Sequence, residues 1–183
     1  MKSSDLHRLL AAYHPQDLKE KRDLERMKAL LPKGESAFLG STFQPGHFTA
    51  SAFLLSPCGT ELGLIFHGKL ERWLQPGGHF SSSDRSCQEA AKRELVEETQ
   101  VKNITLWQDG LFDIDIHLIP FNKKKNEPAH EHFDVRFAFQ AGTREAAASS
   151  DARDFKWVPL TALSEAGTDA SVQRAAQKFL AAG

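Results

Sequence analysis

Apolar positions divide the chain into a helical first part and a strand-rich remainder. Within the first 35 residues, leucines and other apolar side chains recur at helical spacing in two stretches, each closed by a proline. From Phe48 onward, the apolar positions come in short runs that turn residues separate, a pattern typical of strands. We therefore predict a helical N-terminal extension over residues 1–35 and one main domain over residues 36–183.

The N-terminal extension carries no catalytic motif. Its simplest interpretation is a pair of helices packed on the main domain. Two alternatives are a lid over a site and an arm that joins two copies of the chain in a homodimer. The pattern favours packing on the main domain and leaves the other two open.

The main domain is expected to be a mixed sheet with helices packed on its faces, an α/β fold. Residues 132–140 show the strand pattern, because apolar and polar side chains alternate along them so that one face is core and the other is polar. The other expected strands are residues 48–56, 61–67, 70–75, 111–119 and 154–159, and the expected helices are residues 86–100 and 171–182.

Three glutamates share one face of the helix expected over residues 86–100. Glu94, Glu97 and Glu98 stand at positions i, i+3 and i+4, which a helix places within an arc of about 100°. The small apolar residues of the same segment lie in that arc, so the carboxylates are predicted to point toward the body of the protein. Those residues are Cys87, Ala90 and Ala91.

Such a face needs a counter-charge. Three like charges repel one another, and partial burial removes their hydration. A hard divalent cation would resolve both problems, because carboxylate oxygens are its natural ligands. The upstream pair Gly77-Gly78 would let backbone carbonyls approach the same cation, since neither residue has a side chain to block it. The alternative is a solvated acidic helix, but the glycine pair and the inward arc favour the cation.

The spacing of these residues resembles that of a known family. Gly77-Gly78, a short loop and then Arg93-Glu94-Leu95-Val96-Glu97-Glu98 resemble the Nudix box. The resemblance implies a Nudix-type α/β/α sandwich around a mixed sheet. It also implies hydrolysis of a nucleoside diphosphate linked to another moiety, with Mg²⁺ as cofactor and Mn²⁺ as a substitute.

Carried over to this chain, the resemblance assigns residue roles. It makes Glu94, Glu97 and Glu98 metal ligands together with the carbonyl of Gly78, and it lets Arg93 orient a carboxylate. In the implied reaction, a metal-activated water attacks phosphorus in the diphosphate bond. Glu94 and Glu98 are both candidates for the general base.

The chain departs from the Nudix box in three places. Asp84 stands where the pattern has its first glutamate, one extra residue separates Asp84 from Arg93, and Gln100 stands where the pattern has glycine. Asp84 keeps a carboxylate and is predicted to cap the following helix. None of the departures removes an implied metal ligand, so activity is expected. The reading Gln75-Pro76-Gly77-Gly78-His79 also resembles a bacterial subgroup of the family.

Two other functions stay open. The first is a catalytically silent Nudix-like module that binds a nucleotide or a nucleotide sugar. The second is an isomerase for an allylic diphosphate on the same fold, which would need a catalytic cysteine near the start of the domain. Cys58 lies in a Pro-Cys-Gly turn, a poor setting for that role. The presence of all three helix glutamates favours hydrolysis.

Polar residues on one strand form a second candidate site. His130, His132, Asp134 and Arg136 alternate with period two and so share a face. They could contact phosphate or sugar hydroxyls of a substrate, with Arg136 forking onto an oxyanion. They could also hold a transition metal or form a solvated polar face. We favour substrate contact, which His79 after the glycine pair would join.

Composition narrows the partners and the setting. The formal net charge is −1 at pH 7, which argues against a surface for nucleic acid. No apolar run approaches the length of a membrane span, and the first residues lack the apolar stretch of a signal peptide. Two cysteines are too few for a disulfide framework. A cytoplasmic location is therefore expected, and the resemblance to the Nudix box implies a small nucleoside diphosphate derivative as the substrate.

Overall fold

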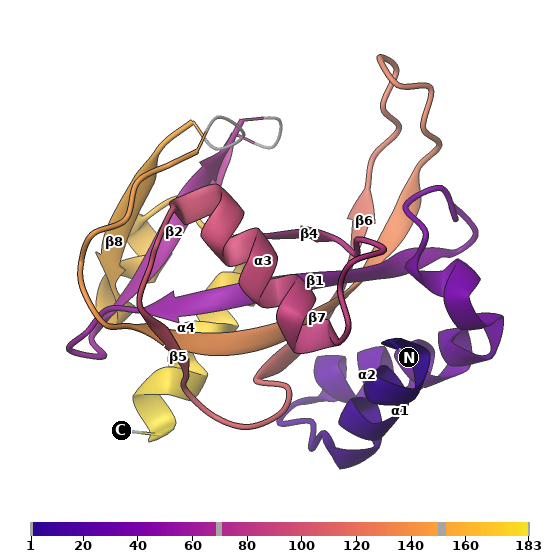
Figure 1. Cartoon of the computed structure of the whole chain (residues 1–183), viewed down its shortest axis with the longest axis horizontal. Coiled ribbons are helices and arrows are strands. Elements are labelled where there is room, and N and C mark those ends of the chain that lie inside the picture. Colours follow the sequence, from indigo (N-terminus) through magenta and orange to yellow (C-terminus); the bar gives the residue numbers. More distant parts are fainter. Residues whose placement is uncertain (1, 69–70, 150–152, 183) are drawn as a thin grey trace.

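The computed structural model describes residues 2–68, 71–149 and 153–182. Its described strands form one mixed sheet with helices on its faces, which confirms the expected fold class (Figure 1). The elements in chain order are α1 (Lys2–Ala12), α2 (Leu18–Leu30), the 3₁₀ segment η1 (Leu31–Phe38), β1 (Gly46–Leu55), β2 (Glu61–His67), β3 (Arg72–Leu74), β4 (Gly77–His79), α3 (Cys87–Thr99), β5 (Ile104–Leu106), β6 (Asp113–Ile119), β7 (His130–Ala141), β8 (Phe155–Pro159), the 3₁₀ segment η2 (Leu160–Glu165) and α4 (Ala170–Ala182).

The expected elements are observed with small shifts at their ends. The strand predicted over residues 70–75 is shorter, at Arg72–Leu74, and Leu70 lies outside the described residues. The sequence pattern did not indicate β4 and β5, because each has only three residues and shows no alternation of its own. Both strands are held by longer neighbours, β4 by β1 and β5 by β7.

The centre of the sheet is the parallel pair β1 and β7. Their register runs without interruption from Gly46 opposite Glu131 to Leu55 opposite Gln140, so both strands begin at the same edge of the sheet. The antiparallel neighbours are β4 and β2 on β1, and β6 on β7. This arrangement places the beginnings of β1 and β7 beside the end of β4.

Alternation along these strands gives the sheet two different faces. On one face, Phe48, Ala50 and Phe133 are buried in a core that includes the small residues of α3. On the other face, Phe53 lies in a second core, where the rings of Phe112 and Phe179 stack with centroids 4.1 Å apart. Figure 1 shows α3 in front of the sheet and α4 behind it.

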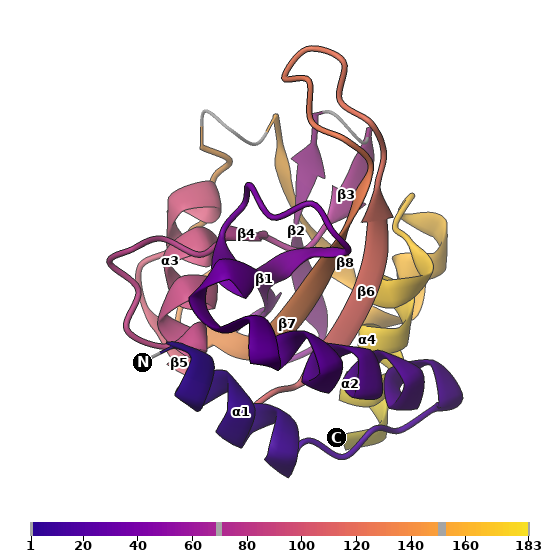
Figure 2. The same cartoon turned by 90° about the vertical axis from the view of Figure 1, so that its right-hand side faces the viewer.

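Both N-terminal helices pack on the main domain (Figure 2). Apart from the exposed Leu18, their leucines are buried in the same core as the front face of the sheet, and the Asp5 carboxylate accepts a hydrogen bond of 2.9 Å from the backbone N–H of Cys87. In α2, the Asp23 carboxylate accepts a bond of 3.0 Å from the N–H of Ile116 in β6. None of the helices in the described part of the chain is long and apolar enough to cross a membrane.

The N-cap of helix α3 lies two residues after the predicted cap, Asp84. The N-cap is Ser86, whose hydroxyl accepts the N–H of Glu89 at 3.1 Å. The prediction that Asp84 caps this helix is wrong, because its carboxylate instead binds Arg93 and the N–H of Ser81. At the other end, Gln100 has a φ of 53°, in the left-handed region that favours glycine at helix ends.

Candidate active site

Strand β4 brings the glycine pair into contact with the glutamates of α3. The N–H of Gly77 donates to Oε2 of Glu98 at 2.9 Å. A Cβ added to Gly78 would lie 2.7 Å from Oε2 of Glu94, so any side chain at this position would displace that carboxylate. Glycine at position 78 is therefore required for this close approach of backbone and carboxylate.

Arg93 fastens the glutamate helix to the glycine turn. Its guanidinium donates to Glu94 at 2.8 Å, to Glu97 at 2.9 Å, and to the backbone carbonyl of His79 at 2.9 Å. It also binds Asp84 through two bonds of 2.9 and 3.1 Å. The bond that Arg93 donates to Asp84 raises the pKa of Arg93. Burial opposes ionisation of Asp84, but the hydrogen bonds from Arg93 and the N–H of Ser81, with the attraction of nearby cations, together outweigh it and lower the pKa of Asp84.

The three glutamates differ in exposure. The side chain of Glu94 is 14% exposed and burial raises its pKa, whereas the side chain of Glu97 is 57% exposed. Glu94 and Glu98 thus face the glycine turn, and Glu97 reaches toward solvent while Arg93 holds it. The donor set consists of carboxylate oxygens beside a backbone with no side chain in the way, which fits a hard divalent cation.

The polar face of β7 is divided into two parts, and Arg136 belongs to the buried part. The side chain of Arg136 is 1% exposed, and it binds Asp134 at 2.7 Å and Asp113 at 3.3 Å. Burial would lower the pKa of Arg136, but the surrounding aspartates raise it instead. Asp134 is also buried and accepts the hydroxyls of Thr49 and Ser51. The charges of Asp134 and Arg136 are therefore used within the protein.

Further groups from α2 and α4 close this buried network. Lys178 binds Asp113 at 2.6 Å and Glu20 at 2.6 Å. Arg174 binds Asp113 at 2.8 Å. Burial opposes the ionisation of Asp113 and Asp115, but Arg136 and the other donors around each carboxylate together outweigh it and lower the pKa of both. The network joins α2 and α4 to the sheet.

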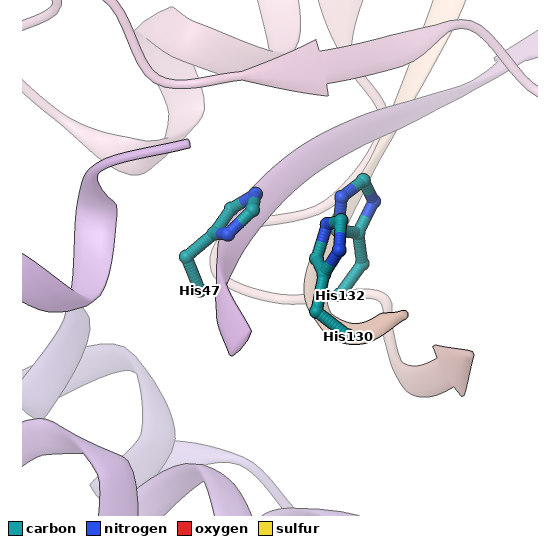
Figure 3. Close-up of side chains that lie close together, drawn as sticks. All are labelled: His47, His130 and His132. Carbon is teal, nitrogen blue, oxygen red and sulfur yellow. The ribbon is translucent and has the colours of Figure 1, made fainter. Parts of the chain in front are cut away.

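The beginning of the same face carries histidines. His132 lies directly opposite His47 of β1 in the register, and His130 precedes it on the same face. His47 and His130 are buried, while His132 is partly buried (Figure 3). The exposed His79 lies nearby, with its ring centroid 5.0 Å from that of His47. Burial lowers the pKa of His47 to about 4 and that of His132 to about 2.

Comparison with known proteins places this geometry in a family. A model described as NUDIX domain matches residues 49–180, a stretch that contains the glycine turn, Arg93 and the three glutamates. The chain belongs to the NUDIX domain family. The expectation drawn from the Nudix box is thereby confirmed at the level of the family.

Individual Nudix relatives are more distant. "Probable DHNTP pyrophosphohydrolase" of Lactococcus lactis subsp. cremoris is 34% identical over 86 residues, 47% of this chain and 50% of the relative. The match thus spans about half the length of that curated relative. An Ap4A hydrolase binary complex of C. elegans is 18% identical with a TM-score of 0.58, covering 73% of this chain and 95% of the other.

One solved structure matches almost the whole of this Nudix chain. The NUDIX domain of Shewanella oneidensis NrtR, solved with ADP ribose, is 15% identical with a TM-score of 0.54 and covers 96% of this chain and 97% of the other. At this identity the likeness shows the fold, and it confirms the Nudix arrangement of a mixed sheet flanked by helices.

The sequence did not single out His47, nor Asp113 and Asp115 as partners of Arg136. His47 follows Gly46 at the start of β1 and shows no motif of its own. It reaches His132 only because β1 and β7 pair in parallel across 85 positions of the chain. The alternation of Asp113, Asp115 and His117 on β6 was the available signal, since it matches that of β7.

Proposed function

We propose that this Nudix protein is a Mg²⁺-dependent hydrolase that cleaves a phosphoanhydride bond in a nucleoside diphosphate derivative. The observation that carries the proposal is the contact of Gly77 and Gly78 with Glu98 and Glu94, which Arg93 holds in place. The relatives support the substrate class, because their names include a pyrophosphohydrolase, an Ap4A hydrolase and a domain bound to ADP ribose.

The oxygens of Glu94, Glu97 and Glu98 and the carbonyl of Gly78 would hold the metal, with Mn²⁺ as a substitute for Mg²⁺. When bound, the metal supplies neutralisation of the diphosphate and a water of lowered pKa. A phosphoryl transition state carries its charge on oxygens, so a fixed cation is the main requirement. The chain meets it by holding several carboxylates together at one end of a sheet.

The other residues prepare these carboxylates. Arg93 offsets the mutual repulsion of Glu94 and Glu97 by donating a hydrogen bond to each carboxylate. The N–H of Gly77 holds one oxygen of Glu98 against the glycine turn. Glu94 and Glu98 are therefore the groups that would accept a proton from the attacking water.

Histidines near the turn would meet the substrate. His79 is exposed and follows Gly78 directly, and His132 is partly buried beside it, with ring centroids 5.2 Å apart. We propose that these imidazoles and His130 border the substrate. The contact of Asp134 and Arg136 with substrate stays a prediction. Because both side chains are buried, they would affect a substrate through the position of strand β7 and not by touching it.

A hydrolysis screen with matched variants tests the proposal. The protein is incubated with Mg²⁺ and nucleoside diphosphate sugars, dinucleoside polyphosphates or nucleoside triphosphates, and phosphate products are measured. Glu97→Gln and Glu98→Gln should each lower kcat by at least about 100-fold, since each removes a carboxylate that would hold the cation that stabilises the transition state. Glu89→Gln, an exposed change on the same helix, should retain the wild-type rate.

Two outcomes would contradict the hydrolase. If the wild type binds a nucleotide but leaves every diphosphate intact with Mg²⁺ and Mn²⁺, the chain is a binding module. If turnover occurs and both glutamine variants keep it, the catalytic cation lies elsewhere.

A further inference from the structure

Three imidazoles converge where β1 and β7 begin. One ring nitrogen from each of His47, His130 and His132 lies within 4.8 Å of the others, and within the described residues this is the group of three that meets the distance. The ring centroid of His47 lies 5.1 Å from that of His130 and 4.8 Å from that of His132. Figure 3 shows the three side chains side by side, one from β1 and two from β7.

Two of the rings are already in the form that binds a metal. Nδ1 of His47 lies 2.9 Å from the carbonyl of Thr42, and Nδ1 of His130 lies 2.8 Å from the carbonyl of Pro128. A carbonyl only accepts, so each Nδ1 carries the proton and each Nε2 presents a lone pair. Metal-binding histidines have this arrangement, in which the second nitrogen donates to a backbone carbonyl.

The lone pair on Nε2 of His47 accepts no hydrogen bond within the described parts of the chain. Its Nε2 is fully buried and meets no hydrogen-bond donor among the described residues. Leaving a buried polar atom unpartnered costs free energy, which a bound ligand would recover. The burial that lowers the pKa of His47 and His132 also keeps their rings neutral, as ligands must be.

The donor type separates this cluster from the glutamates. Neutral imidazole nitrogens favour Zn²⁺ and its neighbours in the first transition series, whereas carboxylates and carbonyls favour Mg²⁺. Gly78 and His79 are consecutive in β4, so their side-chain directions point to opposite faces. Glu94 lies on the side toward which a Cβ on Gly78 would point, whereas the ring of His79 lies beside the rings of His47 and His132. The two donor sets therefore lie on opposite faces of β4.

We propose that His47, His130 and His132 form a binding site for a transition-metal dication of the Zn²⁺ class, separate from the glutamates of α3. Three nitrogens on a tetrahedral Zn²⁺ lie about 3.4 Å apart. The observed spread of up to 4.8 Å closes to that value through rotations of the rings. The partly buried His132 leaves the fourth position accessible, and His79 or a water completes it.

A titration with Co²⁺ reports the site directly. The full chain, stripped of metals with a chelator, is titrated with Co²⁺ and followed by visible absorption, which reports tetrahedral or five-coordinate nitrogen ligation. This absorption should saturate at a single equivalent of Co²⁺, Zn²⁺ should abolish it, and Mg²⁺ at the same concentration should not. Absence of such binding in the wild type would overturn the proposal.

Variants locate the metal. His130→Gln and His132→Gln should weaken Co²⁺ binding by at least about 10–100-fold, the loss that even an outer partner of a ligand causes. His14→Gln removes an exposed imidazole between α1 and α2 and serves as the matched control. Glu97→Gln should also leave Co²⁺ binding unchanged. Binding that survives in both histidine variants, or that is lost in Glu97→Gln, would contradict the site.

Thermal unfolding guards against variants that fail to fold. A ligand that binds only the folded state raises the melting temperature, so Zn²⁺ should stabilise the wild type and the His14→Gln control. A variant is scored only if its circular dichroism and metal-free melting temperature match the wild type, and His132→Gln, with its partly exposed ring, is the milder change. No stabilisation of the wild type by Zn²⁺ would count against the proposal. These measurements do not involve turnover, so they stand whatever the hydrolase screen gives.

Discussion

The two ends of one polar sheet face differ in how their polar groups are satisfied. At the Arg136 end, every buried charge has partners of opposite sign, including Asp113 and Asp134. At the His132 end, the buried Nε2 of His47 lacks a partner among the described residues. Both ends arise from the same period-two alternation along β7. The difference teaches that polar side chains in a repeated pattern contribute to stability where each has a partner within the protein, and are available for binding where one lacks a partner.

Removing the central cation should have the largest effect on this comparison. Arg136→Met leaves Asp113, Asp115 and Asp134 close together and buried without their shared counter-charge. Loss of one partner from a buried ion pair costs about 3–5 kcal/mol. We expect the free energy of unfolding to fall by that amount in urea denaturation. A loss below about 1 kcal/mol would show that the network contributes little.

Acid should weaken the same end of the face. The folded pKa of Asp115 lies below its ordinary value of about 3.9, because Arg136, His117 and Lys19 together outweigh the effect of burial. Such a group stabilises the fold above its unfolded pKa, and the contribution is lost as the pH falls through the folded pKa. The free energy of unfolding should therefore decrease steadily below about pH 5.

Two aspartate variants assign that acid dependence. Asp115→Asn should flatten the decline of unfolding free energy between about pH 5 and pH 2, because the titrating group is gone. The matched change Asp109→Asn, at an exposed position, should keep the wild-type decline. Equal curves for both variants would move the origin of the acid sensitivity away from the network.

The smallest effect is expected at the histidine end. In the metal-free protein, His47→Leu removes one hydrogen bond to Thr42 and also removes the unpartnered Nε2. Loss of the hydrogen bond destabilises the fold by about 1 kcal/mol, and removal of the unpartnered nitrogen stabilises it by about the same amount. The free energy of unfolding should therefore change by less than about 1 kcal/mol. Urea denaturation of His47→Leu and Arg136→Met under the same conditions compares the two losses of unfolding free energy. A loss as large as that of Arg136→Met would mean that the histidines are structural in the same sense.

The sequence predicted the pattern of each element better than the meeting of elements. Alternation placed His130, His132, Asp134 and Arg136 on one face, and the register confirms this. Helical spacing placed the glutamates on the helix that faces the glycine turn. Short-range pattern carries such information because it depends on one element at a time.

Contacts between distant segments could not be predicted in the same way. The burial of Arg136 depends on β6 and on Lys178 and Arg174 of α4, which join the network from the far end of the chain. His47 meets His132 only through parallel pairing. The cap predicted at Asp84 was wrong because Arg93, nine positions away, competes for its carboxylate.

The contact between Asp5 and Cys87 has a practical consequence for handling the protein. The Asp5 carboxylate occupies the first turn of α3, where the helix dipole favours a negative group, and Lys2 donates to the carbonyl of Ser81 in the preceding loop. Helix α1 is thus mechanically coupled to the helix that bears the glutamates. A bulky fusion partner or surface tether attached beside α1 would pull on that helix, so immobilisation through the far end of α4 is the gentler choice for single-molecule or sensor work.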